Sequence, residues 1–365
     1  MISAHVNVSI SAPNSRAWVE VRLAAVVENA RTVARTAGTR LLPIVKANAY
    51  GLGAVAVARA LEAVEPWGYG VATVEEGAEL RAAGISRPIL VLLPAWPARF
   101  GEYRAARLTP VFDHPEALHA WDDGPFHLEI DTGMARGGVR WDEIDQFAAA
   151  VDRTGFEGAF TQLHSSECAD DSVTQQLERY FAALARLPRK PALRHVANSA
   201  AALSDPRCAL DLVRPGIYLY GGTPGGAIVP GRPVVSIRAR VASVRRVRAG
   251  DTVSYNARWQ APRDTKIATL GIGYADGVPP ALGPDGHGRV LLHGAPCPIV
   301  GTVTMDLTLV DVGEQSVTPG DVATLLGEDG AGGECITLAD LVAASGLQPR
   351  GVLTGLGLRL PRVYG

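Results

Sequence analysis

The 365-residue sequence contains little cysteine, and its four cysteines lie far apart. They form neither a metal-binding spacing nor a disulfide pattern, so we expect free thiols and a cytoplasmic protein. The eight histidines are dispersed and form no metal-ligand pair at helical spacing, so we expect no catalytic metal. The formal net charge is only -2, which indicates no nucleic-acid partner.

The sequence also lacks an apolar run long enough to cross a membrane. Its longest, within residues 87–97 (RPILVLLPAWP), is well short of the ~20 residues that a spanning helix needs. Residues 1–18 lack the basic start and apolar core of a signal peptide. A hydrophobic fraction of 47% and a charged fraction of 20% fit a soluble globular protein, and 365 residues can form two domains.

Short apolar runs recur eight times before residue 215, and stretches rich in Ala, Glu and Arg separate them. This alternation predicts a parallel α/β sheet, and a count of eight predicts a closed (β/α)8 TIM-type barrel. Helices are expected at 74–83, 144–154 and 173–187. The predicted strands are 41–46, 68–73, 89–93, 108–112, 126–131, 158–164, 193–197 and 210–214.

The pattern changes near residue 230. The later segments are β-rich, alternate apolar and basic residues or are broken by Gly and Pro, and no long helix is expected before Leu338. The Gly- and Pro-rich segment 221–233 is a natural linker. The sequence therefore predicts a barrel over residues 23–230 and a mostly β C-terminal domain over residues 231–365.

A lysine, Lys46, stands where the first predicted strand gives way to a loop, in PIVKANAYGLG. Barrel enzymes carry their chemistry at the C-terminal ends of the strands. A pyridoxal phosphate enzyme needs a lysine for a Schiff base and a cradle for the phosphate. After the seventh strand, Asn198 or Ser199 would cap a short helix, and after the eighth Gly216 allows close backbone approach to an anion. Arg214 ends that eighth strand.

The chain resembles the alanine racemases over nearly its whole length. The resemblance implies bound pyridoxal 5'-phosphate and a homodimer in which each active site borrows the β domain of the partner. It also suggests that residues 1–22 join the β domain. The stretches that carry it are PIVKANAYGLGA, EIDTGMARGGV, HVANSAA, LVRPGIYLYG, VSYNARW, LGIGYADGV, IVGTVTMDLTLVDV and RLPRVYG.

The resemblance implies a two-base racemisation of a small amino acid, L-alanine to D-alanine. Lys46 would hold the cofactor as an aldimine and act as one base, and Tyr255 of the partner subunit would be the other. Because a free tyrosine has a pKa of about 10, Tyr255 needs a cationic or hydrogen-bonding neighbour to act at neutral pH.

The resemblance also implies how the cofactor and substrate are held. Arg214 would face the pyridine nitrogen and keep it unprotonated, because its own pKa is far above neutrality. Arg136 would contact the ring oxygen of the cofactor or the substrate carboxylate, and the Met305 backbone N–H would also bind that carboxylate. The phosphate would be bound by Tyr50, Ser199 and the backbone of Gly216 and Ile217.

Two departures from the family pattern concern the cofactor's surroundings. Glu129 stands where many members have a lysine that becomes carbamylated, so it would supply the negative charge directly. Arg136 would lower the pKa of Glu129 and form charge-assisted hydrogen bonds with it. Gln162 replaces a histidine that stacks on the cofactor. Glutamine can hydrogen-bond but cannot take up a proton, and His164 is the nearest residue that could substitute for that histidine.

Two further departures are Leu52, where the family has histidine, and Arg350 with Gly351, where the family has Tyr-Glu at the entrance. Three alternatives remain open. They are a racemase with another or a broader amino acid substrate, a barrel-type pyridoxal phosphate decarboxylase, and a protein that binds the cofactor without catalysis. The decarboxylase would need a C-terminal catalytic cysteine, and Cys335 lies in no such context.

Overall fold

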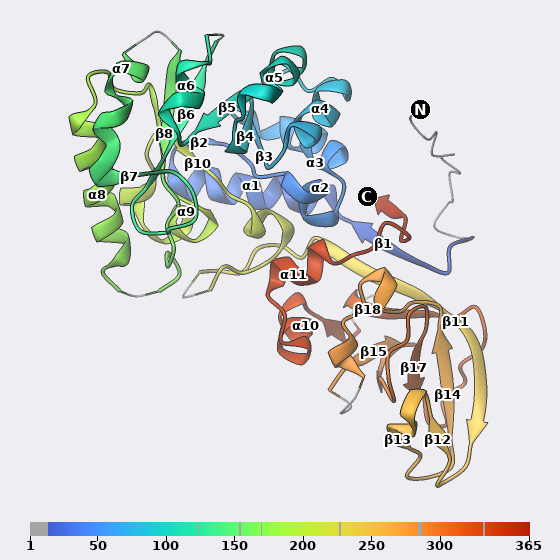
Figure 1. The fold of residues 1–365 in the computed structure, drawn as a ribbon. Helices are drawn as coiled ribbons and strands as arrows, with labels where there is room; N and C mark the ends of the chain where they lie inside the picture. Colours follow the sequence, from blue (N-terminus) through green and yellow to red (C-terminus); the bar gives the residue numbers. More distant parts are fainter. Residues whose placement is uncertain are drawn as a thin grey trace. The chain divides into compact units, whose positions relative to one another are not determined.

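The structure is a computed structural model that describes residues 14–122, 124–152, 155–168, 170–225, 228–283, 287–330 and 333–365. The chain divides into two compact units (Figure 1). One unit is Leu23–Arg232, and the other combines the described residues 14–22 with Pro233–Gly365.

Leu23–Arg232 contains the predicted barrel. In the described part of this unit, six strands pair in parallel in the order β3, β4, β5, β6, β8 and β9, and β10 pairs in parallel with β2. The ring is completed by Arg214 N–H, which donates to Ala197 O (2.9 Å), and by Val45 N–H, which donates to Gly70 O (2.9 Å). The eight strands are β2 (Arg40–Leu41), β3 (Tyr69–Val71), β4 (Ile89–Pro94), β5 (Thr109–Phe112), β6 (Phe126–Asp131), β8 (Phe156–Phe160), β9 (Leu193–His195) and β10 (Leu212–Val213).

Helices alternate with these strands (Figure 1). The predicted helix at 173–187 is α8 (Ser172–Arg186), whose buried residues recur at helical spacing on one face and are apolar or aromatic except for Gln176. Thr73 begins α4 (Val74–Ala82) with a capping box. The other helices are α1 (Leu23–Ala37), α2 (Lys46–Gly51), α3 (Ala54–Leu61), η2 (Glu62–Val64), η3 (Pro97–Arg99), α5 (Phe100–Ala106), α6 (Pro115–His119), α9 (Ser199–Ser204), η5 (Pro206–Cys208) and η6 (Ile217–Tyr220).

The helix predicted at 144–154 is wrong in type and length. The segment forms a 3-10 helix, η4 (Trp141–Phe147), followed by a single α-turn, α7 (Ala148–Val151). Ile144 and Phe147 are both fully buried and lie three residues apart. A helix with three residues per turn places both side chains on its inner face, which an α-helix does less well.

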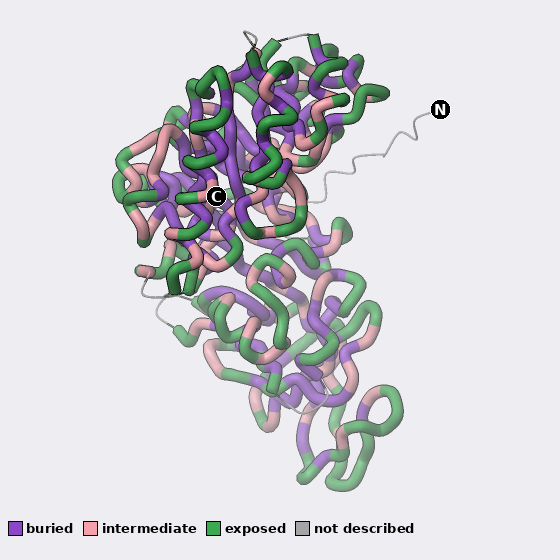
Figure 2. The backbone as a smooth tube through the Cα atoms, turned by 60° about the vertical axis from the view of Figure 1, so that its left-hand side comes forward, coloured by how far each residue is buried: buried purple, intermediate pink, exposed green. Residues whose placement is uncertain are grey.

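The barrel interior is filled by apolar side chains. Leu42, Leu90, Val111 and Phe160 are buried and pack together. They come from strands on different sides of the ring, so the cluster occupies the inside of the barrel and the interior is not an open channel. Figure 2 colours the chain by residue burial, with buried segments in its interior and exposed segments at its outside.

The second unit is mostly β. Its sheet has the strand order β16, β15, β18, β11, β1 and β20, with β14 joined to β11 and β17, and β19 joined to β18. The long strand β11 (Val235–Val247) pairs with β1 (Ala17–Val21) in its first part and with β14 (Thr265–Leu270) in its second part, where the register shifts between Val241 and Ser243. The first described strand of the chain therefore lies in the same sheet as the C-terminal residues.

The remaining elements of this unit are short. Two helices, α10 (Leu338–Ser345) and α11 (Pro349–Thr354), follow the last long strand. None of the helices among the described residues combines the length and the apolar character that a membrane span requires. The other elements are β12 (Thr252–Val253), η7 (Tyr255–Ala257), β13 (Trp259–Gln260), η8 (Tyr274–Asp276), η9 (Pro280–Leu282), β15 (Arg289–Leu292), β16 (Ala295–Pro298), β17 (Thr308–Asp311), β18 (Val322–Glu328), β19 (Cys335–Ile336) and β20 (Arg362–Tyr364).

Candidate active site

Three neighbouring strands of the barrel carry most of the predicted site residues at their C-terminal ends. Lys46 follows the segment that extends β2, Ser199 follows β9, and Arg214 and Gly216 follow β10. Because β9, β10 and β2 are consecutive around the ring, these residues lie on one side of the barrel mouth.

The chain turns left-handed directly after Lys46. Residues 47–50 have φ between 51° and 56°, although none of them is glycine. This conformation costs roughly 1–2 kcal/mol per residue. Side chains hold it in place: Asn48 Oδ1 accepts a hydrogen bond from Ala54 N–H (2.8 Å), and a Glu76 carboxylate oxygen accepts one from Ala47 N–H (2.6 Å). Strain of this kind is typical of functional sites.

A group of hydrogen-bond donors faces the end of β10. Ser199 is buried, and its Oγ accepts hydrogen bonds from Gly216 N–H (2.9 Å) and Tyr218 N–H (3.4 Å). Ile217 begins a 3-10 helix, so its N–H has no partner within that helix. A Cβ atom at Gly216 would lie 2.5 Å from the hydroxyl of Tyr50, so only glycine leaves this space open. Hydroxyl and backbone N–H donors around a glycine fit a phosphate group.

Arg214 is almost completely buried at 4% exposure. Its guanidinium donates to His195 Nδ1 (3.0 Å) and to Thr161 O (2.8 Å), and it lies over the Phe160 ring at 5.1 Å. Burial lowers the pKa of Arg214 to about 10, and the negative charge of Glu129 opposes this shift. The guanidinium therefore remains protonated at neutral pH.

Sequence reasoning missed a relay of hydrogen bonds that starts at Arg214. His195 Nε2 lies 2.8 Å from His127 Nδ1, and His127 Nε2 lies 3.2 Å from a carboxylate oxygen of Glu157. Since Arg214 only donates, His195 accepts at Nδ1 and donates at Nε2, and His127 does the same toward Glu157. Burial lowers the pKa of His127 and lowers that of His195 well below the usual range, so both rings are neutral.

The electrostatic surroundings of Lys46 favour the neutral amine. Burial lowers the pKa of Lys46, the positive charges of Arg136 and Arg214 lower it further, and the carboxylates of Glu76 and Glu129 oppose the shift. An unprotonated amine is the nucleophilic form.

The predicted lowering of the Glu129 pKa is wrong. Glu129 is only 8% exposed, and burial raises its pKa more than Arg136 and Arg214 lower it. The loop between β6 and β7 (Val139–Arg140) covers it: a Cβ at Gly138 would lie 3.0 Å from its Cγ. The expected hydrogen bonds to Arg136 are also absent among the described residues, where Glu129 has a charge interaction with that exposed arginine but no hydrogen bond.

Gln162 rather than His164 contacts Arg214. Gln162 Oε1 accepts a hydrogen bond from the guanidinium at 3.4 Å. The predicted strand 158–164 ends at Phe160, so His164 lies in the following loop, where it is exposed and pairs with Ser165 Oγ (2.7 Å). Leu52 is fully buried, so this departure from the family pattern is accommodated as core packing.

The β unit carries the other predicted residues on two linked loops. Tyr255 begins η7 with 69% exposure, and its backbone O accepts a hydrogen bond from Thr302 Oγ1 (3.4 Å). Met305 is 52% exposed, and its backbone O accepts from Ala275 N–H (3.0 Å). Arg350 is exposed on α11.

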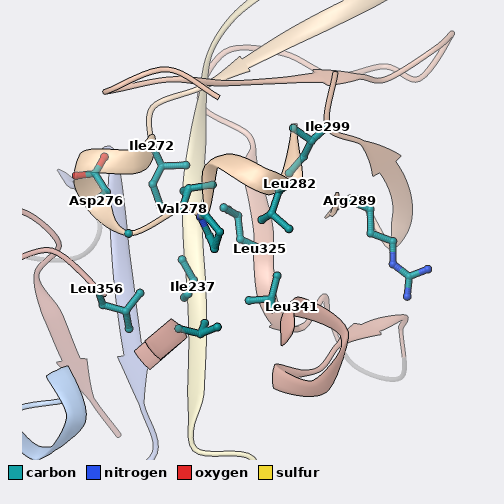
Figure 3. Close-up of a pocket in the computed structure, with 13 residues that line it drawn as sticks. Ile237, Ile272, Asp276, Val278, Leu282, Arg289, Ile299, Leu325, Leu341 and Leu356 are labelled. Atoms are coloured by element: carbon teal, nitrogen blue, oxygen red, sulfur yellow. The ribbon is translucent and has the colours of Figure 1, made fainter. Parts of the chain in front are cut away.

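An apolar pocket in the β unit contains none of the predicted site residues (Figure 3). Ile237, Leu325 and Leu341 line it, with the Asp276 carboxylate at its side. Asp276 binds Arg16 and Arg359, so this charge is already paired. Among the described residues, no group of three or more His, Cys, Asp or Glu side chains is placed to hold a metal ion.

Comparison with known proteins agrees with this geometry. Residues 21–224 match the family model for the alanine racemase N-terminal domain, and residues 234–364 match that for the alanine racemase C-terminal domain. An alanine racemase from Symbiobacterium thermophilum is 38% identical over 371 residues, which cover 95% of this chain and 97% of that protein.

Solved structures of similar proteins have the same fold. The crystal structure of alanine racemase from E. faecalis gives a TM-score of 0.89 at 32% identity and covers 96% of this chain and 98% of its own. Alanine racemase from Bartonella henselae, solved with covalently bound pyridoxal phosphate, gives a TM-score of 0.87 at 30% identity. The match covers 96% of this chain and 100% of that one. The chain therefore belongs to the alanine racemase family.

Proposed function

We propose that the protein is a pyridoxal 5'-phosphate-dependent racemase that interconverts L- and D-alanine. The observation that carries this proposal is the arrangement at the barrel mouth. A half-buried lysine, Lys46, a glycine-lined group of donors and a protonated arginine, Arg214, lie at the ends of three consecutive strands. Membership of the alanine racemase family supports it.

The residues at the mouth fit this cofactor. Lys46 Nζ would hold it covalently. Arg214 would keep the ring nitrogen unprotonated, because the guanidinium keeps its own proton at neutral pH. The relay through His195 orients this guanidinium. The phosphate would be bound by the hydroxyls of Tyr50 and Ser199 and by the N–H groups of Gly216 and Ile217, of which the Gly216 N–H donates to Ser199 Oγ in this structure.

When bound, the cofactor withdraws electrons from the amino acid and makes its α-proton more acidic. Lys46 Nζ takes or returns this proton on one face of the α-carbon, and Tyr255 of the partner subunit does so on the other. Each positioned base contributes roughly 10²- to 10⁴-fold to the rate. Arg136 and the Met305 backbone N–H bind the substrate carboxylate.

A homodimer is part of this proposal. Tyr255, Tyr274, Met305 and Leu307 are 69%, 44%, 52% and 40% exposed. Their loops are joined by hydrogen bonds, among them Tyr274 N–H to Thr304 O at 2.9 Å. A group of exposed apolar side chains on linked loops is typical of an interaction surface, which supports a partner that covers Tyr255.

Incubation of the cofactor-loaded protein with single enantiomers, followed by circular dichroism, tests the activity. Alanine should lose its optical activity fastest and without loss of amino acid. Faster loss with a larger amino acid would instead favour the broader or different substrate that the exposed Arg350 leaves open. Release of carbon dioxide would identify a decarboxylase, and no change with any amino acid would identify a binding protein.

Borohydride reduction followed by peptide mapping tests the lysine. We expect the label on Lys46 alone. A label on another lysine in cofactor-saturated protein would overturn the assignment.

A further inference from the structure

Glu76 connects two strand ends of the barrel through both oxygens of its carboxylate. Oε1 accepts a hydrogen bond from Ala47 N–H at 2.6 Å. Oε2 accepts from Ala72 N–H at 2.7 Å and from Thr73 N–H at 3.4 Å. Thr73 Oγ1 in turn accepts from Glu76 N–H at 3.4 Å, so the start of α4 fixes the position of this side chain.

The hydrogen bond from Ala47 N–H to Glu76 Oε1 is made by the residue next to Lys46. Ala47 is also the first residue of the left-handed turn, at φ 52° and ψ 48°. Alanine has no intrinsic preference for this conformation, so the turn depends on its partners. A carboxylate that holds the Ala47 N–H therefore holds the backbone from which the Lys46 side chain extends.

Glu76 also acts on Lys46 through its charge. Arg136 and Arg214 place positive charge around the lysine, and Glu76 is the carboxylate that opposes them most strongly. Its position combines a direct hydrogen bond to the lysine-bearing turn with a charge that acts on the amine.

We propose that Glu76 is a positioning residue for Lys46, which fixes the left-handed turn behind the lysine and balances the positive charge around its amine. This inference rests on the proposed function only in so far as Lys46 carries the cofactor. The geometric part concerns the protein alone.

Glutamine tests this role because it has nearly the same shape. Both carboxylate oxygens of Glu76 accept backbone N–H groups, and an amide offers only one acceptor, so its NH₂ group would face a donor. Glu75 provides a matched control on the same helix. Its side chain is 67% exposed and pairs with Arg99 at 2.7 Å.

The first measurement is amide hydrogen exchange of the full-length protein without cofactor, read by mass spectrometry on peptides that cover residues 44–53. Loss of a hydrogen bond to a charged group should speed local exchange about tenfold or more in Glu76→Gln. Glu75→Gln should match the wild type. Unchanged exchange in Glu76→Gln would overturn the positioning role.

The second measurement is the pH dependence of the rate at which added pyridoxal 5'-phosphate reacts with Lys46. In this reaction the amine adds to the aldehyde and one water is lost. Removing the negative charge should move the midpoint of the profile to lower pH in Glu76→Gln but not in Glu75→Gln. A merely structural role would lower the rate without moving the midpoint, and that result would overturn the charge role.

The two proposals fail in different ways. If wild-type protein is not labelled at Lys46, the proposed function is wrong, whatever Glu76 does to exchange. If Lys46 is labelled but Glu76→Gln has wild-type exchange and a wild-type profile, the role of Glu76 is wrong and the function stands.

Discussion

His127 and His195 are joined by a 2.8 Å hydrogen bond between Nδ1 of the first and Nε2 of the second, and both side chains are fully buried. Arg214 at one end of the pair can only donate, and Glu157 at the other end accepts when ionised. The two ends together select one tautomer for each ring, with the hydrogen on Nε2. Each hydrogen bond of the relay is therefore donated in the same direction, from Arg214 through His195 and His127 to the half-buried carboxylate of Glu157.

Nitrogen-15 NMR of the histidine rings tests this arrangement. At about pH 6, where an ordinary histidine is mostly protonated, His127 and His195 should be neutral Nε2–H tautomers. Glu157→Ala removes the final acceptor and should mix the tautomers of His127. Glu143→Ala, which removes an exposed carboxylate that pairs only loosely with Arg140 at 3.7 Å, is the control. Imidazolium signals from both buried rings in the wild type would contradict the relay.

The same pair predicts a pH dependence of stability. Burial lowers the pKa of both histidines in the folded protein, while the unfolded chain binds protons near the ordinary value of about 6.5. Their contribution to stability is therefore complete above about pH 6.5 and is lost as the pH falls from there toward the folded pKa. Urea unfolding between about pH 8 and 5.5 should show this decrease in the free energy of unfolding. The change of that free energy with pH should be smaller in His195→Asn. If the free energy of unfolding changes equally with pH in His195→Asn and in the wild type, His195 does not cause the decrease.

The eight strands were predictable because each is a short apolar run followed by a helix-like stretch. The turn at residues 47–50 was not, because Ala, Asn and Tyr show no local preference for four successive left-handed residues. Its main partner, Glu76, lies 29 residues away in the sequence. His127 and His195 are separated by 68 residues, so only the closed barrel shows that they pair.

The sign of the Glu129 pKa shift illustrates another limit. Sequence shows a neighbouring arginine, but not how deeply the strand and its loop bury the carboxylate, and burial decides the sign. The raised pKa means that Glu129 contributes stability below its unfolded pKa of about 4.3 and loses it as pH rises through the folded value.

Glu129→Gln should therefore unfold at a higher urea concentration than the wild type at pH 7, while racemisation slows because a charge near Lys46 is lost. The wild type should also be indifferent to added bicarbonate at constant pH, because a carboxylate forms no carbamate. If Glu129→Gln is less stable than the wild type at pH 7, burial does not dominate the pKa of Glu129.

Gly216→Ala tests the donor group at the end of β10. The added Cβ would lie 2.5 Å from the Tyr50 hydroxyl, so either the tyrosine or the β10 loop must move. We expect cofactor affinity to fall at least tenfold, measured by titration of cofactor-free protein. Tyr50→Phe in the same chain removes the close contact and should restore protein stability but not full affinity.

Gly101→Ala is the matched control for this substitution. Gly101 lies in α5, and a Cβ there would meet nothing within 4 Å. Alanine in a helix should add up to about 1 kcal/mol of stability and leave cofactor binding unchanged. If Gly216→Ala binds the cofactor as tightly as Gly101→Ala does, the phosphate of the cofactor does not approach Gly216.

Tyr255→Phe tests the second base. The ring is 69% exposed in the single chain, so removing its hydroxyl should change the free energy of unfolding by less than about 0.5 kcal/mol and leave the cofactor bound. Racemisation should fall roughly 10²- to 10⁴-fold in both directions, because a change to a catalyst leaves the equilibrium between the enantiomers unaltered. Exchange of the α-hydrogen with deuterated water should persist for the enantiomer whose proton Lys46 removes and fail for the other. Equal exchange from both enantiomers in Tyr255→Phe would mean that a single base, or a residue other than Tyr255, serves both faces.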